Sequence, residues 1–169
     1  MSSEVYNFEP WINVLEPFPG ESISHFLGRF ERANLLTAYQ IGKEAGIGAV
    51  VSRWRKLYFN PFPSQQELEA LANVVEVEVE KLKEMLPQKG ITMKPRPIRL
   101  CAACYAENPY HRIEWQHKDV MKCSHHQLRL LTKCTNCGTA FPIPGDWVTG
   151  ECQHCCLRFA TMVRKQKKS

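Results

Sequence analysis

Cys101-Ala-Ala-Cys104 opens the stretch that decides the fold, and three similar pairs follow it: Cys123-Ser-His-His126, Cys134-Thr-Asn-Cys137 and Cys152-Gln-His-Cys155. Two residues between ligands let a tight turn aim both side chains at one ion, and Zn²⁺ takes four N or S ligands in a tetrahedron. A single pair would be a weak signal, because redox motifs have the same spacing. Four pairs in series predict two closed sites: the first with three Cys and one His, the second with four Cys. They therefore predict two structural zinc ions per chain.

Disulfide bonds are the alternative use of so many cysteines. They form in exported proteins, whereas thiols stay reduced in the cytoplasm. Residues 1–16 contain three Glu and no apolar run, which argues against a secretory signal. No stretch approaches the roughly 18 apolar residues of a membrane span. We therefore expect a cytoplasmic protein with no membrane partner, whose thiols bind metal.

Charge is unevenly spread along the 169 residues. Residues 1–90 carry nine Lys and Arg against twelve Asp and Glu, a net of −3, whereas residues 91–169 carry thirteen against five, a net of +8. Seven zinc-bound thiolates and two Zn²⁺ ions would reduce the second figure to about +5. The acidic part suits a protein partner, and the basic part suits the phosphate backbone of DNA or RNA.

Residues 21–87 have the apolar spacing of short helices. We expect helices over Ser22–Leu35, Thr37–Ala45 and Ala49–Leu57, a fourth that opens at the capping box Ser64-Gln65-Gln66-Glu67, and a fifth that ends at Pro87. A helix, a glycine-containing turn and a second helix with outward Arg and Lys is the order of a helix-turn-helix. The sequence therefore predicts a mainly α, helix-turn-helix-like bundle.

Composition divides the chain into five segments. We expect an extended arm over residues 1–20, the helical domain over 21–87, a proline-rich linker over 88–99, a tandem zinc-binding domain over 100–160 and a mobile basic tail over 161–169. Within the zinc-binding domain, Ile113–Trp115 and Leu128–Leu131 are predicted to be short strands. We therefore expect the zinc-binding domain to consist of small α+β modules of the zinc-ribbon kind, in which metal coordination takes the place of a large apolar core.

Two groups of residues are candidates for binding partners. Trp11, Ile12 and Leu15 of the arm either fold back onto the bundle or anchor a partner protein. Trp54 lies on the apolar stripe of its helix and is expected in the core. Its basic neighbours are expected to face outward, towards phosphates or a protein, and with two linker residues they form the candidate nucleic-acid contacts: Arg53, Arg55, Lys56, Arg96 and Arg99.

Two longer motifs carry a resemblance. One is Pro19-Gly20-Glu21-Ser22 followed by Ser24 and Arg29, and the other is the run Cys101-x-x-Cys104, His111-Arg112-x-x-Trp115, Cys123-x-x-His126-x-x-x-Leu130-Leu131, Cys134-x-x-Cys137-Gly138. They resemble the start and the zinc region of the TniQ family, the targeting adaptors of bacterial transposons. The resemblance covers roughly residues 10–160, and so short a chain is similar to the adaptors of type V-K CRISPR-associated transposons.

The resemblance implies a non-enzymatic adaptor with zinc modules packed behind a helix-turn-helix-like domain. Such an adaptor bridges a cleavage-dead type V CRISPR effector, with its guide RNA and target DNA, to TnsC. TnsC is an AAA+ ATPase that forms filaments on DNA and recruits the transposase. Family likeness also favours sequential pairing of the four ligand pairs, the first two around one ion and the last two around the other. An interleaved pairing is the alternative.

Some predicted ligands have neighbours that could replace them. The two-residue spacing favours Cys155 over Cys156 and His126 over His125 as ligands. The sequence leaves the alternative open in both cases, with Cys156 or His125 as the ligand. His111 is expected to form hydrogen bonds or to be exposed rather than to bind metal.

An enzyme is not expected. Residues 42–48 contain glycines but lack the Lys and Ser/Thr that complete a phosphate-binding loop. Closed four-ligand metal sites also leave no position for a catalytic water. The other function considered is a stand-alone zinc-containing helix-turn-helix DNA-binding regulator of transcription, which would share these features. Neighbouring genes for an AAA+ ATPase and a transposase would favour the adaptor.

Overall fold

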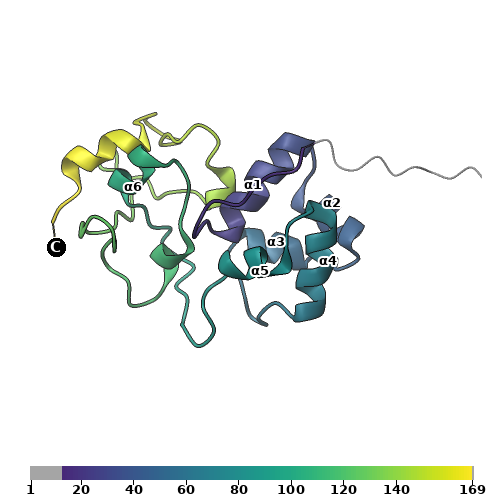
Figure 1. Cartoon of the computed structure of the whole chain (residues 1–169). Helices are drawn as coiled ribbons and strands as arrows, with labels where there is room; N and C mark the ends of the chain where they lie inside the picture. Colours follow the sequence, from purple (N-terminus) through teal and green to yellow (C-terminus); the bar gives the residue numbers. More distant parts are fainter. Residues whose placement is uncertain (1–12, 169) are drawn as a thin grey trace, which may run out of the picture.

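The computed structural model describes residues 13–168, whose helices fall into two groups (Figure 1). The N-terminal group, purple to teal in Figure 1, contains α1 Ile23–Asn34, α2 Ala38–Ala45, α3 Val50–Arg55, α4 Gln65–Val75 and α5 Val79–Glu84. The C-terminal group, green to yellow, contains α6 Ala102–Glu107 and the 3₁₀ helices η1 Ile113–Gln116, η2 Pro144–Asp146 and η3 Phe159–Lys165. We call these the helical group and the cysteine-rich group.

Side-chain caps fix where three helices of the helical group begin. The Ser22 hydroxyl accepts a hydrogen bond from the N–H of His25 at the start of α1. Thr37 and Ser64 begin α2 and α4, each in a capping box whose third helical residue bonds back to the cap. The Ser64 box is the predicted one. All five predicted helices are present, with ends shifted by a few residues.

One apolar core holds these five helices together. It includes Phe26 and Phe30 of α1 and Trp54 of α3, which is 1% exposed. The prediction that Trp54 is a core residue is confirmed. Leu15 packs against the edge of the same core, so this residue of the arm folds back onto the bundle. The other two candidate anchors, Trp11 and Ile12, lie outside the described residues.

A second apolar core lies among the cysteines, around Trp115, Trp147 and Phe159. Residues 113–116 form the 3₁₀ helix η1, so the strand predicted there is wrong. The neighbours Trp115 and Gln116 are both buried, whereas successive residues of a strand point to opposite faces. Residues 128–131 contribute isolated bridges, such as the one between Leu131 and Leu100. The described chain is mostly helical with few strand pairings, and the predicted fold class is confirmed.

The last described residues belong to this second core. η3 packs along α6, and its Met162 is 1% exposed. Gln166 is buried, accepts a hydrogen bond from the N–H of Ala102 (3.0 Å) and donates one to the carbonyl of Arg129 (3.0 Å). Met162 and Gln166 thus attach the predicted basic tail to the cysteine-rich group, while its four charged side chains stay exposed: Arg164, Lys165, Lys167 and Lys168. Gln166 lies four residues after Met162, so a helical turn brings both side chains to the buried side of η3.

The two groups meet where η2 packs against α1 (Figure 1). The Ser24 hydroxyl donates to the carbonyl of Arg55 and accepts from the N–H of Gly145 (3.0 Å). Arg55 also forms ion pairs with Glu31 of α1 (2.6 Å) and Asp146 of η2 (2.8 Å). One arginine thus connects α3, α1 and η2, and we call this contact region the joint.

The motif around Glu21 forms the other side of the joint. Glu21 is fully buried and contacts His25 and Arg29, the latter at 2.7 Å. Burial raises the pKa of the Glu21 carboxyl, but the hydrogen bonds with His25 and Arg29 outweigh it and hold that pKa below its ordinary value. The Ser22 N–H donates to the His111 carbonyl (2.9 Å), and the two side chains are hydrogen-bonded at 2.8 Å. These residues link the two groups of helices.

Candidate metal centres

The first two ligand pairs converge on one point. Cys101 precedes α6, Cys104 lies in its first turn, and all four ligand atoms, including those of Cys123 and His126, lie within 4.8 Å of one another. Cys104 Sγ is 3.3 Å from both Cys123 Sγ and His126 Nδ1, and Cys101 Sγ is 3.9 Å from that nitrogen. With the usual bond lengths, a tetrahedral zinc site separates its ligand atoms by about 3.6–3.8 Å. The geometry therefore suits a metal ion.

Glu107 completes this centre from outside the ligand set. Its Oε1 lies 2.8 Å from Nε2 of His126, the ring nitrogen that points away from the thiols. This hydrogen bond raises the pKa of His126 and fixes Nδ1 as the ligand nitrogen, as carboxylates do beside many metal-bound histidines. Sequence analysis missed Glu107. The available signal was its position three residues after Cys104 on one helix, which places the two on the same face.

The last two ligand pairs form the second centre. Cys134 Sγ lies 3.6 Å from Cys155 Sγ, and Cys137 Sγ lies 3.5 Å from Cys152 Sγ. The four sulfur atoms again lie within 4.8 Å of one another. The structure thus groups the pairs sequentially, the arrangement that the resemblance favoured. All eight cysteines, Cys156 included, are outside disulfide bonds.

The thiols of the second centre differ in acidity before any cation is considered. Burial raises the pKa of Cys134 to about 11, whereas hydrogen bonding with the side chain and backbone of Thr139 lowers the pKa of the exposed Cys137 to about 5. A bound dication favours the thiolate at every position, so it would reverse the effect of burial at Cys134.

One backbone turn is repeated in three of the four pairs. The N–H of the first Cys donates to the carbonyl five residues on: Cys123 to Leu128, Cys134 to Thr139 and Cys152 to Leu157, at 2.8–2.9 Å. The residue four positions after that Cys bonds back to it and has a positive φ: Gln127 (56°), Gly138 (74°) and Cys156 (61°). Cys156 therefore occupies the turn position, and Cys155 joins the second centre as the two-residue spacing predicted.

The structure distinguishes one candidate ligand histidine, His126, from His125 and His111. His126 contributes to the first centre, while Nε2 of His125 lies 3.9 Å from a Glu114 carboxylate oxygen. His111 is completely buried and hydrogen-bonded to Ser22 and Gln116, and burial lowers its pKa to about 3. His111 is thus a neutral structural residue of the joint.

The five candidate nucleic-acid residues lie in different environments. Arg53, Lys56 and Arg96 are exposed. Arg55, expected to be exposed, is mostly covered by the ion pairs of the joint. Arg99 is 4% exposed, and its guanidinium donates to the carbonyls of residues 115, 117 and 120. Both guanidinium groups are committed inside the protein, where a phosphate backbone does not reach them.

Comparison with protein families returned one match. A family model described as TniQ matches residues 13–130, which include the helical group, the joint motif and the first metal centre. No curated protein matches the chain. Among the described residues, no helix has the length and apolar character needed to cross a bilayer.

Proposed function

This chain belongs to the TniQ family of transposition-associated adaptors, and we propose that it is the targeting adaptor of an RNA-guided transposon. It connects a cleavage-dead type V CRISPR effector, bound with guide RNA at its target DNA, to the AAA+ ATPase TnsC, and so directs where the transposase inserts. The family match over residues 13–130 carries the adaptor role. The RNA-guided role rests on the separate likeness to the adaptors of type V-K CRISPR-associated transposons. The complex works in the cytoplasm, on the nucleoid.

Each metal centre in this proposal holds one structural Zn²⁺. The ligands are Cys101, Cys104, Cys123 and His126 in the first and Cys134, Cys137, Cys152 and Cys155 in the second. Thiolate and imidazole donors at these separations suit Zn²⁺, which when bound supplies folding energy to a small domain. Four protein ligands fill each tetrahedron, so no position is open for a catalytic water, in keeping with a non-catalytic family.

The proposed division of labour follows charge. The acidic part of the chain, residues 1–90 with a net charge of −3, docks on the ATPase, with Trp11 and Ile12 as anchors in the arm. Arg53 and Lys56, which are exposed at the end of α3, contact the phosphate backbone of DNA or RNA. Arg55 and Arg99 are left out of this proposal because their guanidinium groups bond inside the protein.

Reconstitution tests the proposal. The zinc-loaded chain, TnsC, the transposase and an effector–guide RNA complex are mixed with target DNA and transposon donor DNA. Assembly is followed by size, and site-directed insertion is measured. We expect insertion at the guided site only when the chain is present. Tight sequence-specific DNA binding by the chain alone, with no effect on insertion, would instead favour the transcription regulator.

A further inference from the structure

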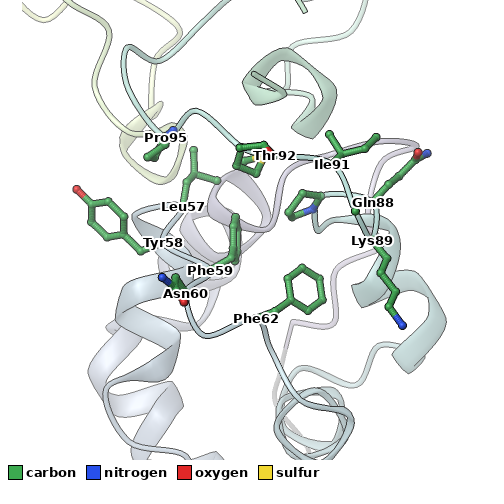
Figure 2. Close-up of a pocket in the computed structure, with 13 residues that line it drawn as sticks. Leu57, Tyr58, Phe59, Asn60, Phe62, Gln88, Lys89, Ile91, Thr92 and Pro95 are labelled. Carbon is green, nitrogen blue, oxygen red and sulfur yellow. The ribbon is translucent and has the colours of Figure 1, made fainter. Parts of the chain in front are cut away.

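A large apolar groove lies away from both metal centres. It encloses about 920 Å³ between residues 57–62, which follow α3, and residues 87–95, which lead towards α6. Figure 2 shows Phe59 and Phe62 projecting from the first segment towards the second, across from Ile91 and Thr92. We call it the linker groove. Its volume is in the range of known ligand sites, which are lined mainly by apolar side chains.

Exposed apolar side chains concentrate at this groove. Among residues 13–168, ten large apolar side chains are exposed, and three of them line the linker groove: Tyr58 (47%), Phe62 (50%) and Ile91 (40%). Single exposed apolar residues need no explanation, but a cluster around a hollow marks a contact surface. The linker groove is therefore a surface built to be covered.

The two segments that form the groove are strongly basic. Residues 53–63 and 87–99 contain seven Lys and Arg and no Asp or Glu. Arg55 and Arg99 are used inside the protein, which leaves five exposed cations: Arg53, Lys56, Lys89, Lys94 and Arg96. None of the ion pairs among the described residues involves these five. The segments that form the groove thus carry positive charge that no ion pair of the described chain neutralises.

We infer that the linker groove binds an acidic peptide segment of a partner protein, which inserts an aromatic or aliphatic side chain between Phe62 and Ile91. Carboxylates beside that anchor pair with Lys89, Lys94 and Arg96 at the rim, so that charge supplies selectivity and the anchor supplies most of the affinity. The inference goes beyond the proposed function, because it holds whichever component of the machinery carries the segment.

A single-stranded nucleic acid fits the groove less well. Proteins that bind single strands track the backbone with cations along the channel and stack bases on open aromatic faces. Here Lys89 is the one charged residue that lines the hollow. One face of the Tyr58 ring is covered by the Arg96 guanidinium, 5.5 Å from the ring centre, and is therefore not open to a stacked base. An apolar floor with a cationic rim matches an acidic, apolar peptide.

Selection of peptides tests the inference. A displayed library of random 12-residue peptides is selected on the zinc-loaded full chain, and the most enriched peptide is labelled with fluorescein for titration. We expect enriched peptides to place Trp, Phe or Leu beside Asp or Glu. Their binding should weaken at least tenfold with Phe62→Ser and also with the charge reversal Lys94→Glu. Tyr39→Ser, which removes an exposed aromatic side chain (65%) from α2, is the matched control and should leave binding unchanged.

Four results would overturn the inference: no enrichment, enriched peptides without acidic residues, binding that ignores Phe62→Ser, or a labelled oligo-dT that binds and requires Phe62. Thermal melts show whether each variant is folded, and Phe62 is half-exposed, so its loss should leave the fold intact. A last experiment uses a variant that lacks residues 1–12, which contain two Glu and no Lys or Arg. Tighter peptide binding after that removal would make this segment, rather than a partner, the occupant.

Discussion

Gly28 of α1 lies directly against Gly145 of η2, so that two backbones touch at the joint. A Cβ built on Gly28 would collide with the Gly145 carbonyl oxygen and Cα. That carbonyl also accepts a hydrogen bond from Arg32 (2.7 Å), and the Gly145 N–H donates to Ser24 (3.0 Å). Residues 117 positions apart in the chain are thus held at a distance that only glycine permits on the α1 side.

Gly28→Ala should therefore destabilise the protein by separating η2 from α1. In an ordinary helix interior the same change stabilises by about 0.5–1 kcal/mol, so the expected sign is opposite to that of helix propensity. Urea unfolding measures the free energy, and tryptophan fluorescence, to which Trp147 near the joint contributes, reports a change in packing. A more stable variant with unchanged fluorescence would contradict the close backbone contact.

Two zinc ions should be found per chain by metal analysis. Cys104→Ser should lose one ion and unfold much of the cysteine-rich group, because metal-binding energy in such modules is largely folding energy. Cys156→Ser is the matched control, since this cysteine occupies a turn position, and it should keep both ions. Equal loss in the two variants would mean that the ligand assignment is wrong.

Glu107→Gln should weaken metal binding at the first centre by about 10–100-fold, the usual effect of removing the carboxylate behind a histidine ligand. Competition with a chromophoric chelator measures the two affinities separately. The second centre should be unaffected, and Glu151→Gln, beside that centre, should leave the first unchanged. Parallel losses at both centres would indicate general unfolding instead.

His111 should make the protein less stable as pH falls below neutral. Its folded pKa of about 3 lies below the ordinary 6.5, so the unfolded chain binds a proton that the folded chain does not. Stability from this group is complete above about pH 7 and decreases between pH 6.5 and 3, by roughly 1.4 kcal/mol per pH unit where only the unfolded state is protonated.

The contribution of His111 can be isolated with His111→Gln. Zinc loss and protonation of Glu21 also act at low pH, but they are common to both proteins. Between pH 6.5 and 5 the wild type should lose about 1.6 kcal/mol more than the variant. Parallel pH profiles would show that His111 is protonated in the folded protein.

Arg55→Ala should cost about 1–2 kcal/mol, because it leaves Glu31, 12% exposed, without its charged partner. Arg53→Ala, two residues away and exposed, should change stability by less than about 0.5 kcal/mol. The expectation that both arginines face outward is wrong for Arg55. Unfolding of the two variants side by side decides the matter, and equal small effects would mean that the joint does not depend on Arg55.

Sequence alone was sufficient for several features that depend on near neighbours, though not for the local 3₁₀ helix η1, which it predicted as a strand. The Ser64 capping box, the apolar stripe containing Trp54 and the two-residue ligand spacing all act within one helical turn or one tight turn. The spacing also favoured His126 over His125 and Cys155 over Cys156, and the turn repeated in three of the four pairs gives the reason.

Only the tertiary structure decided which charges stay at the surface. Arg55 and Arg99 have the same local pattern as exposed arginines, yet one is held by Asp146, far along the chain, and the other by carbonyls that face inward. The joint between Gly28 and Gly145 likewise has no local signature. Its energy comes from two segments that meet only after both cores have formed, and so the linker groove, the use of Glu107 and the ordered C-terminal residues could not be read from spacing along the chain.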